Sequence, residues 1–238
     1  METQTGLNSL KYTAFAYSIL LLPSFRQDLV PDLLHNLETR GFKTEIVRLL
    51  YPGEEASVAL QKESDLREYS VGYQWSQVKM ALFGLCLCKA TKVILVSGGI
   101  LPSAHLLESM MLLVCSDSAD VVIASRFSSG SMSQYPIHQR LLSRLFRKAS
   151  RFAVSNQITD PRSGVKLFDR RTLLNVLSRI ATSSSDLHLL PLTYFRHSRI
   201  TEVPAPAQTG GSRYPLNRRV LGNALSDLAR AVLHRNLW

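Results

Sequence analysis

The sequence predicts an α/β fold in which helices flank a mostly parallel sheet. Short apolar runs that suit buried strands alternate with helical segments, and Pro or Gly residues separate the two kinds. The chain has 238 residues and no Gly-, Ser- or Pro-rich linker that would divide two cores. We therefore expect a single domain over residues 1–238.

The first predicted strand, near residues 16–23, is a continuous apolar run, as expected of a parallel strand that is buried on both faces. The other predicted strands lie near residues 45–50, 92–97 and 121–126. The helical segments between them are 28–41, 76–90 and 103–116. Ligands bind at the carboxyl ends of the strands in such sheets. The candidates there are Pro23, Ser24, Tyr51, Ser97, Gly98, Gly99 and Arg126.

The charge of the chain is concentrated in its second half. Residues 1–120 hold 10 Lys and Arg against 13 Asp and Glu, whereas residues 121–238 hold 18 against 5. The two halves thus carry −3 and +13, which gives the net +10 of the chain. This asymmetry indicates an anionic partner such as phosphates, an anionic membrane surface or nucleic acid. The alternative is a solvated basic face.

A basic amphipathic helix is predicted at 140–154, after a Ser-rich loop at 128–139 that is a candidate mobile segment. Its apolar face holds Leu141, Leu145, Phe146, Ala149 and Phe152. Its basic residues are Arg140, Arg144, Arg147, Lys148 and Arg151. Such a helix suits a membrane surface rich in anionic lipid, and a helix packed on the core with a basic outer side fits equally well.

No membrane-spanning helix or secretory signal is expected. Pro23 ends the most apolar early run far short of the roughly 20 residues that a spanning helix needs. The three Cys residues lie in apolar stretches, so we expect buried thiols in a reducing compartment.

The segment "TDPRSGVKLFDRR" at 159–171 carries more polar groups than a turn requires. They are Asp160, Arg162, Ser163, Gly164 and Lys166. Together with Arg126 and Arg213, the Arg and Lys side chains would give charge-assisted hydrogen bonds to phosphate oxygens. Asp160 would orient one of these cations or cap the turn. The alternative is a structural turn with ordinary surface ion pairs.

Four segments occur in the order and approximate spacing of family-two glycosyltransferases of the dolichol- and polyprenol-phosphate mannose synthase type, which the chain resembles. They are "ADVVIASRF", "DPRSGVKLFDRR", "RHSRITEVPAPA" and "GGSRYPLNRR". The resemblance implies a GT-A fold, with a nucleotide-binding half at 16–126 and an acceptor half at 127–238. It also implies a nucleotide-sugar donor, Mg²⁺ or Mn²⁺, a polyprenyl or dolichyl phosphate acceptor, and a place at the cytoplasmic membrane face.

The chain departs from this family wherever the family has acids. "PSFRQ" replaces a Pro-x-Tyr-Asn-Glu-like stretch, Leu50 and Tyr51 end the second strand, and Ser97–Gly99 replaces an Asp-x-Asp pair. Hard cations need oxygen ligands, chiefly carboxylates, so we expect no bound metal. Candidate displaced ligands are Glu54, Glu55 and Glu108. The resemblance also implies an acidic residue at the position of His188. Asp186, two residues earlier, is a better candidate for a catalytic base than His188, although the signal for it is weak.

Three functions remain open. The first is a degenerate glycosyltransferase-like protein at the membrane that binds a lipid phosphate or modulates an active glycosyltransferase. The second is an active, metal-independent transferase that moves a sugar from a nucleotide sugar to a polyprenyl phosphate. The third is a basic polyanion-binding module, although the lack of aromatic side chains between the basic ones counts against nucleic acid.

Overall fold

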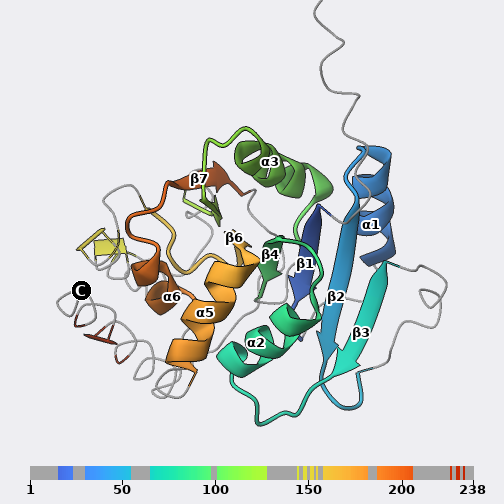
Figure 1. Cartoon of the computed structure of the whole chain (residues 1–238), viewed down its shortest axis with the longest axis horizontal. Helices are drawn as coiled ribbons and strands as arrows, with labels where there is room; N and C mark the ends of the chain where they lie inside the picture. Colours follow the sequence, from blue (N-terminus) through green and yellow to red (C-terminus); the bar gives the residue numbers. More distant parts are fainter. Residues whose placement is uncertain are drawn as a thin grey trace, which may run out of the picture.

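A twisted sheet runs through the centre of the molecule (Figure 1). The structure is a computed structural model, and it describes residues 16–23, 30–54, 65–97, 101–127, 158–181 and 187–205, with 144, 147, 148, 151, 152, 154, 226, 229, 230 and 233. The described residues form a seven-stranded sheet of order β3-β2-β1-β4-β6-β5-β7. The strands are β1 Tyr17–Leu21, β2 Thr44–Leu50, β3 Leu66–Ser70, β4 Lys92–Val96, β5 Val121–Ser125, β6 Val165–Asp169 and β7 Ile200–Pro204.

The sheet is parallel except for β6. The pairs β1–β2, β1–β4, β2–β3 and β5–β7 are parallel, whereas β6 runs antiparallel to both of its neighbours, β4 and β5. The expected mostly parallel sheet is therefore confirmed, with all four predicted strands in it. Because β6 runs the other way, its first residues lie at the edge where the parallel strands end.

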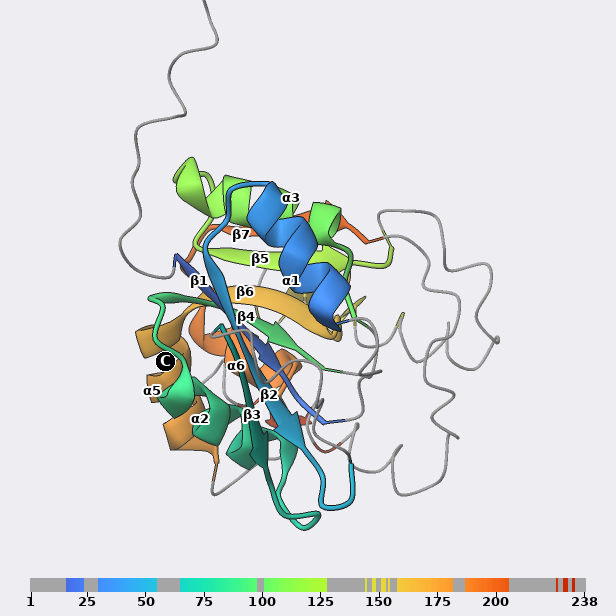
Figure 2. The ribbon, with the colours of Figure 1, turned by 90° about the vertical axis from the view of Figure 1, so that its right-hand side faces the viewer.

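Helices cover both faces of the sheet, so that the molecule has three layers (Figure 2). The helices are α1 Val30–Thr39, α2 Gln77–Leu87, α3 Ala104–Cys115, α5 Arg170–Ile180 and α6 Leu189–Tyr194. Side chains of α1 and α3 form one buried cluster with alternate strand residues such as Ile19 and Ile94. Side chains of α2, α5 and α6 form the other, with Leu20 and Leu95. The alternation follows from the two-residue period of a strand.

The helix ends have local causes. Ser76, Ser103 and Asp169 each accept a hydrogen bond at the start of a helix from the main-chain N–H three residues later. Gly41 follows α1 with φ +82°, a conformation that Gly adopts without the steric cost of a side chain. These signals fix α1, α2 and α3 close to the predicted helical segments.

One expectation about a local feature needs correction. All three Cys thiols are free, but only Cys88 is buried, whereas Cys86 and Cys115 are exposed. Burial, with the Glu45 carboxylate nearby, raises the pKa of Cys88 to about 12, which makes this thiol a poor nucleophile. None of the helices in the described part of the chain combines the length and the apolar character needed to cross a bilayer.

Candidate functional site

The turn at 160–164 lies where β4 and β5 end and β6 begins. Ser97, after β4, donates its main-chain N–H to the carbonyl of Gly164 at 2.8 Å. Ser163 donates its hydroxyl to the carbonyl of Ala124 in β5 at 2.5 Å. The turn therefore bridges two carboxyl ends of the sheet, the edge at which such sheets bind ligands.

Arg126 and Asp160 form the tightest ion pair at this edge. The guanidinium donates from Nε to Oδ2 at 2.7 Å and from Nη2 to Oδ1 at 2.8 Å, and the Arg126 main-chain N–H adds a third bond of 3.0 Å to Oδ2. Asp160 is 1% exposed, so the expectation of an ordinary surface ion pair is wrong. Of the two roles proposed for Asp160, orienting a cation is the one that the geometry gives, and the cation is Arg126.

Glu202 in β7 holds the start of the turn. Its Oε1 accepts the main-chain N–H groups of Thr159 at 2.7 Å and of Asp160 at 2.8 Å, and its Oε2 accepts the Thr159 hydroxyl. Glu202 lies in the segment "RHSRITEVPAPA", and no role was predicted for it. The available signal was that this acid is one of only 5 in the basic half of the chain.

Gly164 is required by a close approach of two backbone segments. A Cβ at this position would lie 2.2 Å from the carbonyl oxygen of Ser97. Ser97 is itself held in place, because its main-chain N–H donates a hydrogen bond to the carbonyl of Gly164. The Ser97 carbonyl oxygen therefore has little freedom to move away. The Ser-Gly pair at the centre of the motif is thus a packing requirement of the strand edge.

Lys166 lies inside β6 and points into the α6 side of the sheet, where it is 2% exposed. Its ammonium donates to the carbonyl of Ser163 at 2.5 Å and lies 3.4 Å from Nδ1 of His188. An ammonium has no acceptor, so Nδ1 accepts. Lys166 was expected as part of the turn, and the structure places it instead beneath the turn, holding a turn carbonyl.

His188 stands immediately before α6, in the midst of the cations of the site. Burial holds the pKa of His188 well below its ordinary value, and the charges of Lys166, Arg162 and Arg126 lower it further. An interaction with the Ser163 main chain acts in the opposite direction. The imidazole is therefore neutral at pH 7.

The donor-side candidates are less closely grouped. Pro23 is buried after β1, and Tyr51 follows β2, where its ring stacks on Tyr73. Ser97 turns its main chain toward Gly164, and its hydroxyl donates to the same carbonyl at 3.3 Å. The predictions on Ser24, Gly98, Gly99, Arg140 and Arg213 fall outside the described residues.

The residues at this edge do not fit a divalent metal ion. Among the described residues, no group of three or more His, Cys, Asp or Glu side chains is placed to hold a metal ion. The carboxylates of Asp160 and Glu202 already accept three hydrogen bonds each. Of the displaced ligands considered, Glu54 accepts the Tyr51 N–H at 2.9 Å and Glu108 pairs with Arg40, whereas Glu55 falls outside the described residues.

The basic helix is described at only a few positions. Arg144, Lys148 and Arg151 are exposed in helical conformation, and Phe152 is exposed as well. Arg147 is half-buried, with its guanidinium carbon 4.0 Å from the centre of the Phe127 ring. Arg147 therefore contributes to packing, and it is less available to a surface than its neighbours are.

The order of the strands, the single antiparallel strand and the turn at their carboxyl edge define a GT-A fold, the fold of a large class of glycosyltransferases, as the resemblance implied. Solved structures that are similar to the chain include two proteins with this fold. One is glucosyl-3-phosphoglycerate synthase (GpgS) from Mycobacterium tuberculosis in complex with Mn²⁺, UDP-glucose and phosphoglyceric acid, with a TM-score of 0.58 and 13% identity over 92% of this chain and 79% of that one.

A second similar structure is S. aureus TarS 1–349 in complex with UDP-GlcNAc, with a TM-score of 0.54 and 13% identity over 92% of this chain and 69% of that one. No family model matches the sequence. No curated protein matches it either. At 13% identity the likeness establishes the fold, and the sugars and acceptors are those of the other proteins.

Proposed function

We propose that this protein is a glycosyltransferase-like protein that binds a polyprenyl phosphate at the cytoplasmic face of a membrane and does not carry out metal-dependent sugar transfer. The observation that carries this proposal is a group of cationic side chains at the carboxyl edge of the sheet. Arg126 pairs with Asp160, Lys166 lies 3.4 Å from Nδ1 of His188, and Arg162 stands in the turn at 160–164.

The cationic side chains of this group suit a phosphate. Arg and Lys donors form charge-assisted hydrogen bonds with phosphate oxygens, and a half-buried site strengthens them. The M. tuberculosis structure offers a parallel, since phosphoglyceric acid, which carries a phosphate, is one of its ligands. A lipid phosphate also accounts for the basic residues Arg144, Lys148 and Arg151 in the same half of the chain.

The loss of metal-dependent transfer is inferred from the side chains present. Ser97 stands where the resemblance expects the first acid of a metal-binding pair, and its polar groups bond Gly164. His188 stands where the resemblance implies an acidic residue, and Nδ1 of its imidazole already accepts a hydrogen bond from Lys166. This nitrogen is therefore not available as a catalytic base. A protein of this kind would bind the lipid for, or modulate, an active glycosyltransferase.

The test compares vesicles of phosphatidylcholine that contain either polyprenyl phosphate or phosphatidylglycerol at equal surface charge. We expect co-sedimentation to favour polyprenyl phosphate, and Arg162→Gln to reduce that preference by about tenfold. Arg171→Gln is the control, because it removes the same charge from an exposed position of α5. Arg171 lies at the opposite edge of the sheet, where the main-chain N–H of its neighbour Arg170 donates to the carbonyl of Thr91, just before β4. Arg171→Gln should leave the preference intact.

Two results would contradict the proposal. Equal binding to both vesicle types, with stronger binding to nucleic acid at matched salt, would favour the polyanion-binding module. Transfer of a sugar from a nucleotide sugar to polyprenyl phosphate in the presence of a chelator would identify a metal-independent transferase.

A further inference from the structure

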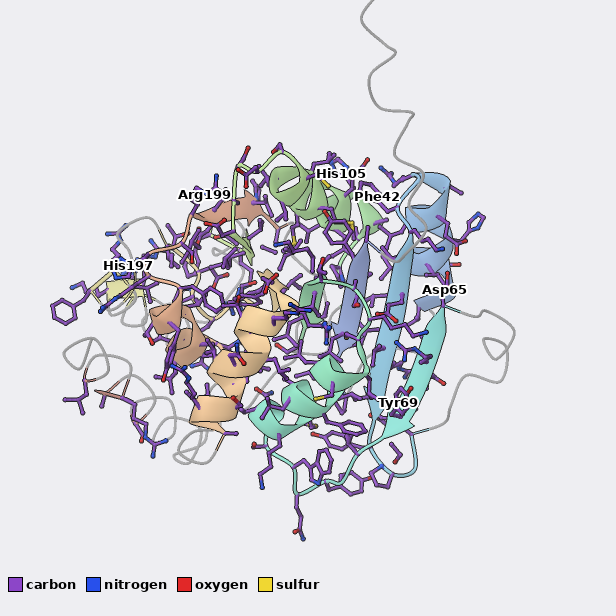
Figure 3. The ribbon with its side chains drawn as sticks, viewed as in Figure 1. Phe42, Asp65, Tyr69, His105, His197 and Arg199 are labelled. Atoms are coloured by element: carbon purple, nitrogen blue, oxygen red, sulfur yellow. The ribbon has the colours of Figure 1, made fainter. Side chains whose placement is uncertain are left out.

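A patch of aromatic side chains lies at the carboxyl edge of β2 and β3, apart from the cationic turn. We call Tyr51, Tyr73, Trp75 and Phe83 the aromatic patch. The rings of Tyr51 and Tyr73 are stacked, with centroids 5.0 Å apart and planes at 19°, and Trp75 meets Phe83 edge to face at 5.5 Å. The ring of Tyr69, labelled in Figure 3, meets Phe83 edge to face at 6.1 Å. The rings are thus held in fixed positions by one another.

This arrangement leaves a large apolar surface in contact with water. Tyr73 is 67% exposed and Trp75 is 40% exposed. Trp75 and Phe83, together with Lys79 and Leu82, line an open hollow of about 330 Å³. Single exposed apolar residues are normal, but two exposed aromatic side chains close together in the chain, each packed on another ring, favour a surface that binds something.

The chemistry of the patch is that of a membrane interface. Tyr and Trp side chains combine an apolar ring with a polar end, and they gather at the boundary between lipid and water. Tyr73 keeps its hydroxyl bonded to the carbonyl of Pro52, so its ring is held on the surface. Lys79 adds an exposed cation on an alkyl stem at the rim of the hollow, which suits a surface that contains phosphate head groups.

The place of the patch in the fold points to the same partner. The patch follows the carboxyl ends of β2 and β3, and the turn with Arg162 lies at the carboxyl ends of β4 and β5 in the same sheet. A lipid phosphate has its head group at the membrane surface, so a protein that binds one there must turn this edge toward the bilayer. The aromatic patch would then meet the interface.

We propose that the aromatic patch contacts the membrane, with Tyr73 and Trp75 among the lipid head groups and Lys79 beside their phosphates, so that the carboxyl edge of the sheet faces the bilayer. This inference rests on the proposed function, because it takes the lipid phosphate as the ligand of the neighbouring turn. It adds an apolar contact that does not depend on the charge of the lipid.

Tryptophan fluorescence tests the contact directly, because the chain has only two Trp residues, Trp75 and Trp238. In a Trp238→Phe variant the emission comes from Trp75 alone. We expect vesicles of phosphatidylcholine with polyprenyl phosphate to shift this emission to shorter wavelength, and lipids brominated in their acyl chains to quench it.

Co-sedimentation of variants gives a second measurement. Trp75→Gln and Tyr73→Ser should each weaken binding to these vesicles by roughly three- to tenfold, because each ring leaves water only in part. The preference for polyprenyl phosphate over phosphatidylglycerol should stay unchanged. Leu112→Gln is the matched control, since Leu112 is 49% exposed on α3, on the other face of the sheet, and it should bind as the unchanged protein does.

The outcomes separate this inference from the proposed function. If the protein co-sediments with polyprenyl phosphate vesicles while the emission of Trp75 stays unshifted and unquenched, the membrane contact of the patch is wrong and the proposed function stands. If no vesicle is bound, both are wrong. A shift that appears on raising the protein concentration without lipid would assign the patch to a contact between copies of the chain and overturn the inference.

Discussion

The ammonium of Lys166, in the centre of the sheet, lies 3.4 Å from Nδ1 of His188 at the start of α6. The pair joins the layer of α5 and α6 to the only antiparallel strand among those described. Because Lys166 also holds the carbonyl of Ser163, any change in the charge of His188 acts on the turn that forms the candidate site.

Stability should therefore fall in mild acid. The pKa of His188 is lowered in the folded protein, whereas an unfolded His titrates near 6.5. Above that pH the imidazole is neutral in both states. As the pH falls below about 6.5, only the unfolded state takes up the proton, and stability drops by up to about 1.4 kcal/mol per pH unit until the folded pKa is reached.

Urea unfolding measures this loss of stability. A range from about pH 7.5 to about pH 5 spans the ordinary His pKa of about 6.5. We expect His188→Asn to flatten the pH dependence and His105→Asn, on the exposed side of α3, to leave it unchanged. An identical slope for His188→Asn and the unchanged protein would contradict the neutral state of His188 in the folded protein. The charged groups of the site near His188 are Lys166, Arg162 and Arg126, and Asp160 pairs with Arg126.

Asp160→Asn should destabilise the fold by about 2 kcal/mol. The change removes the charge of a buried acceptor and turns an amide toward the Arg126 donors, while Arg126 itself, 37% exposed, can recover water. The midpoint of urea unfolding measures the loss. Asp120→Asn is the matched control, because Asp120 also pairs with an Arg, Arg199, but both side chains are exposed, and it should cost clearly less. Equal losses would show that burial of Asp160 is unimportant.

The sequence predicted those parts of the fold that follow from one local pattern. The segments that became β1, β2, β4 and β5 are buried along nearly their whole length, and their Ile, Leu and Val residues mark them, although β2 also buries Glu45 and Arg48. β3 was missed, because "LREYS" lies at the sheet edge, is only half-buried, and carries charged residues. β6 was missed because Lys166 interrupts its apolar pattern, and a buried Lys is a tertiary feature that the sequence does not announce.

The site shows the same division. Arg126 and the turn were placed together correctly, because both follow from where strands end. The role of Glu202 depends on β7 lying beside β5, a pairing between segments about 80 residues apart that no local pattern encodes. The position of Lys166 beneath the turn depends on the direction of β6, which could not be read from composition or periodicity.

Divalent metal ions should have little effect on ligand binding. No described carboxylate at the strand ends is available to a metal, because Asp160 and Glu202 each accept three hydrogen bonds. Calorimetric titration with nucleotide diphosphate-sugars should give the same affinity with and without Mn²⁺ or Mg²⁺. A tenfold gain with Mn²⁺, about 1.4 kcal/mol, would show that the chain binds the metal with ligands other than those identified, and Glu54→Gln would then be tested first.

The basic helix should provide attraction to anionic lipid that depends on salt and is independent of the turn. Arg144, Lys148 and Arg151 are exposed, and each cation near an anionic surface contributes about 1 kcal/mol within a Debye length of about 10 Å at 0.1 M salt. Changing all three to Gln should therefore weaken binding to phosphatidylglycerol vesicles by about a hundredfold or more at low salt, and the difference should shrink as salt is added.

Arg147→Gln is the internal comparison, because Arg147 stacks on Phe127 and is half-buried. It should reduce vesicle binding less than any of the three exposed cations does, and it should lower the unfolding midpoint more. Vesicle co-sedimentation over a salt series measures the first effect, and urea unfolding measures the second. If the triple change left binding to anionic vesicles unaltered, the positive charge of this helix would have to serve another partner.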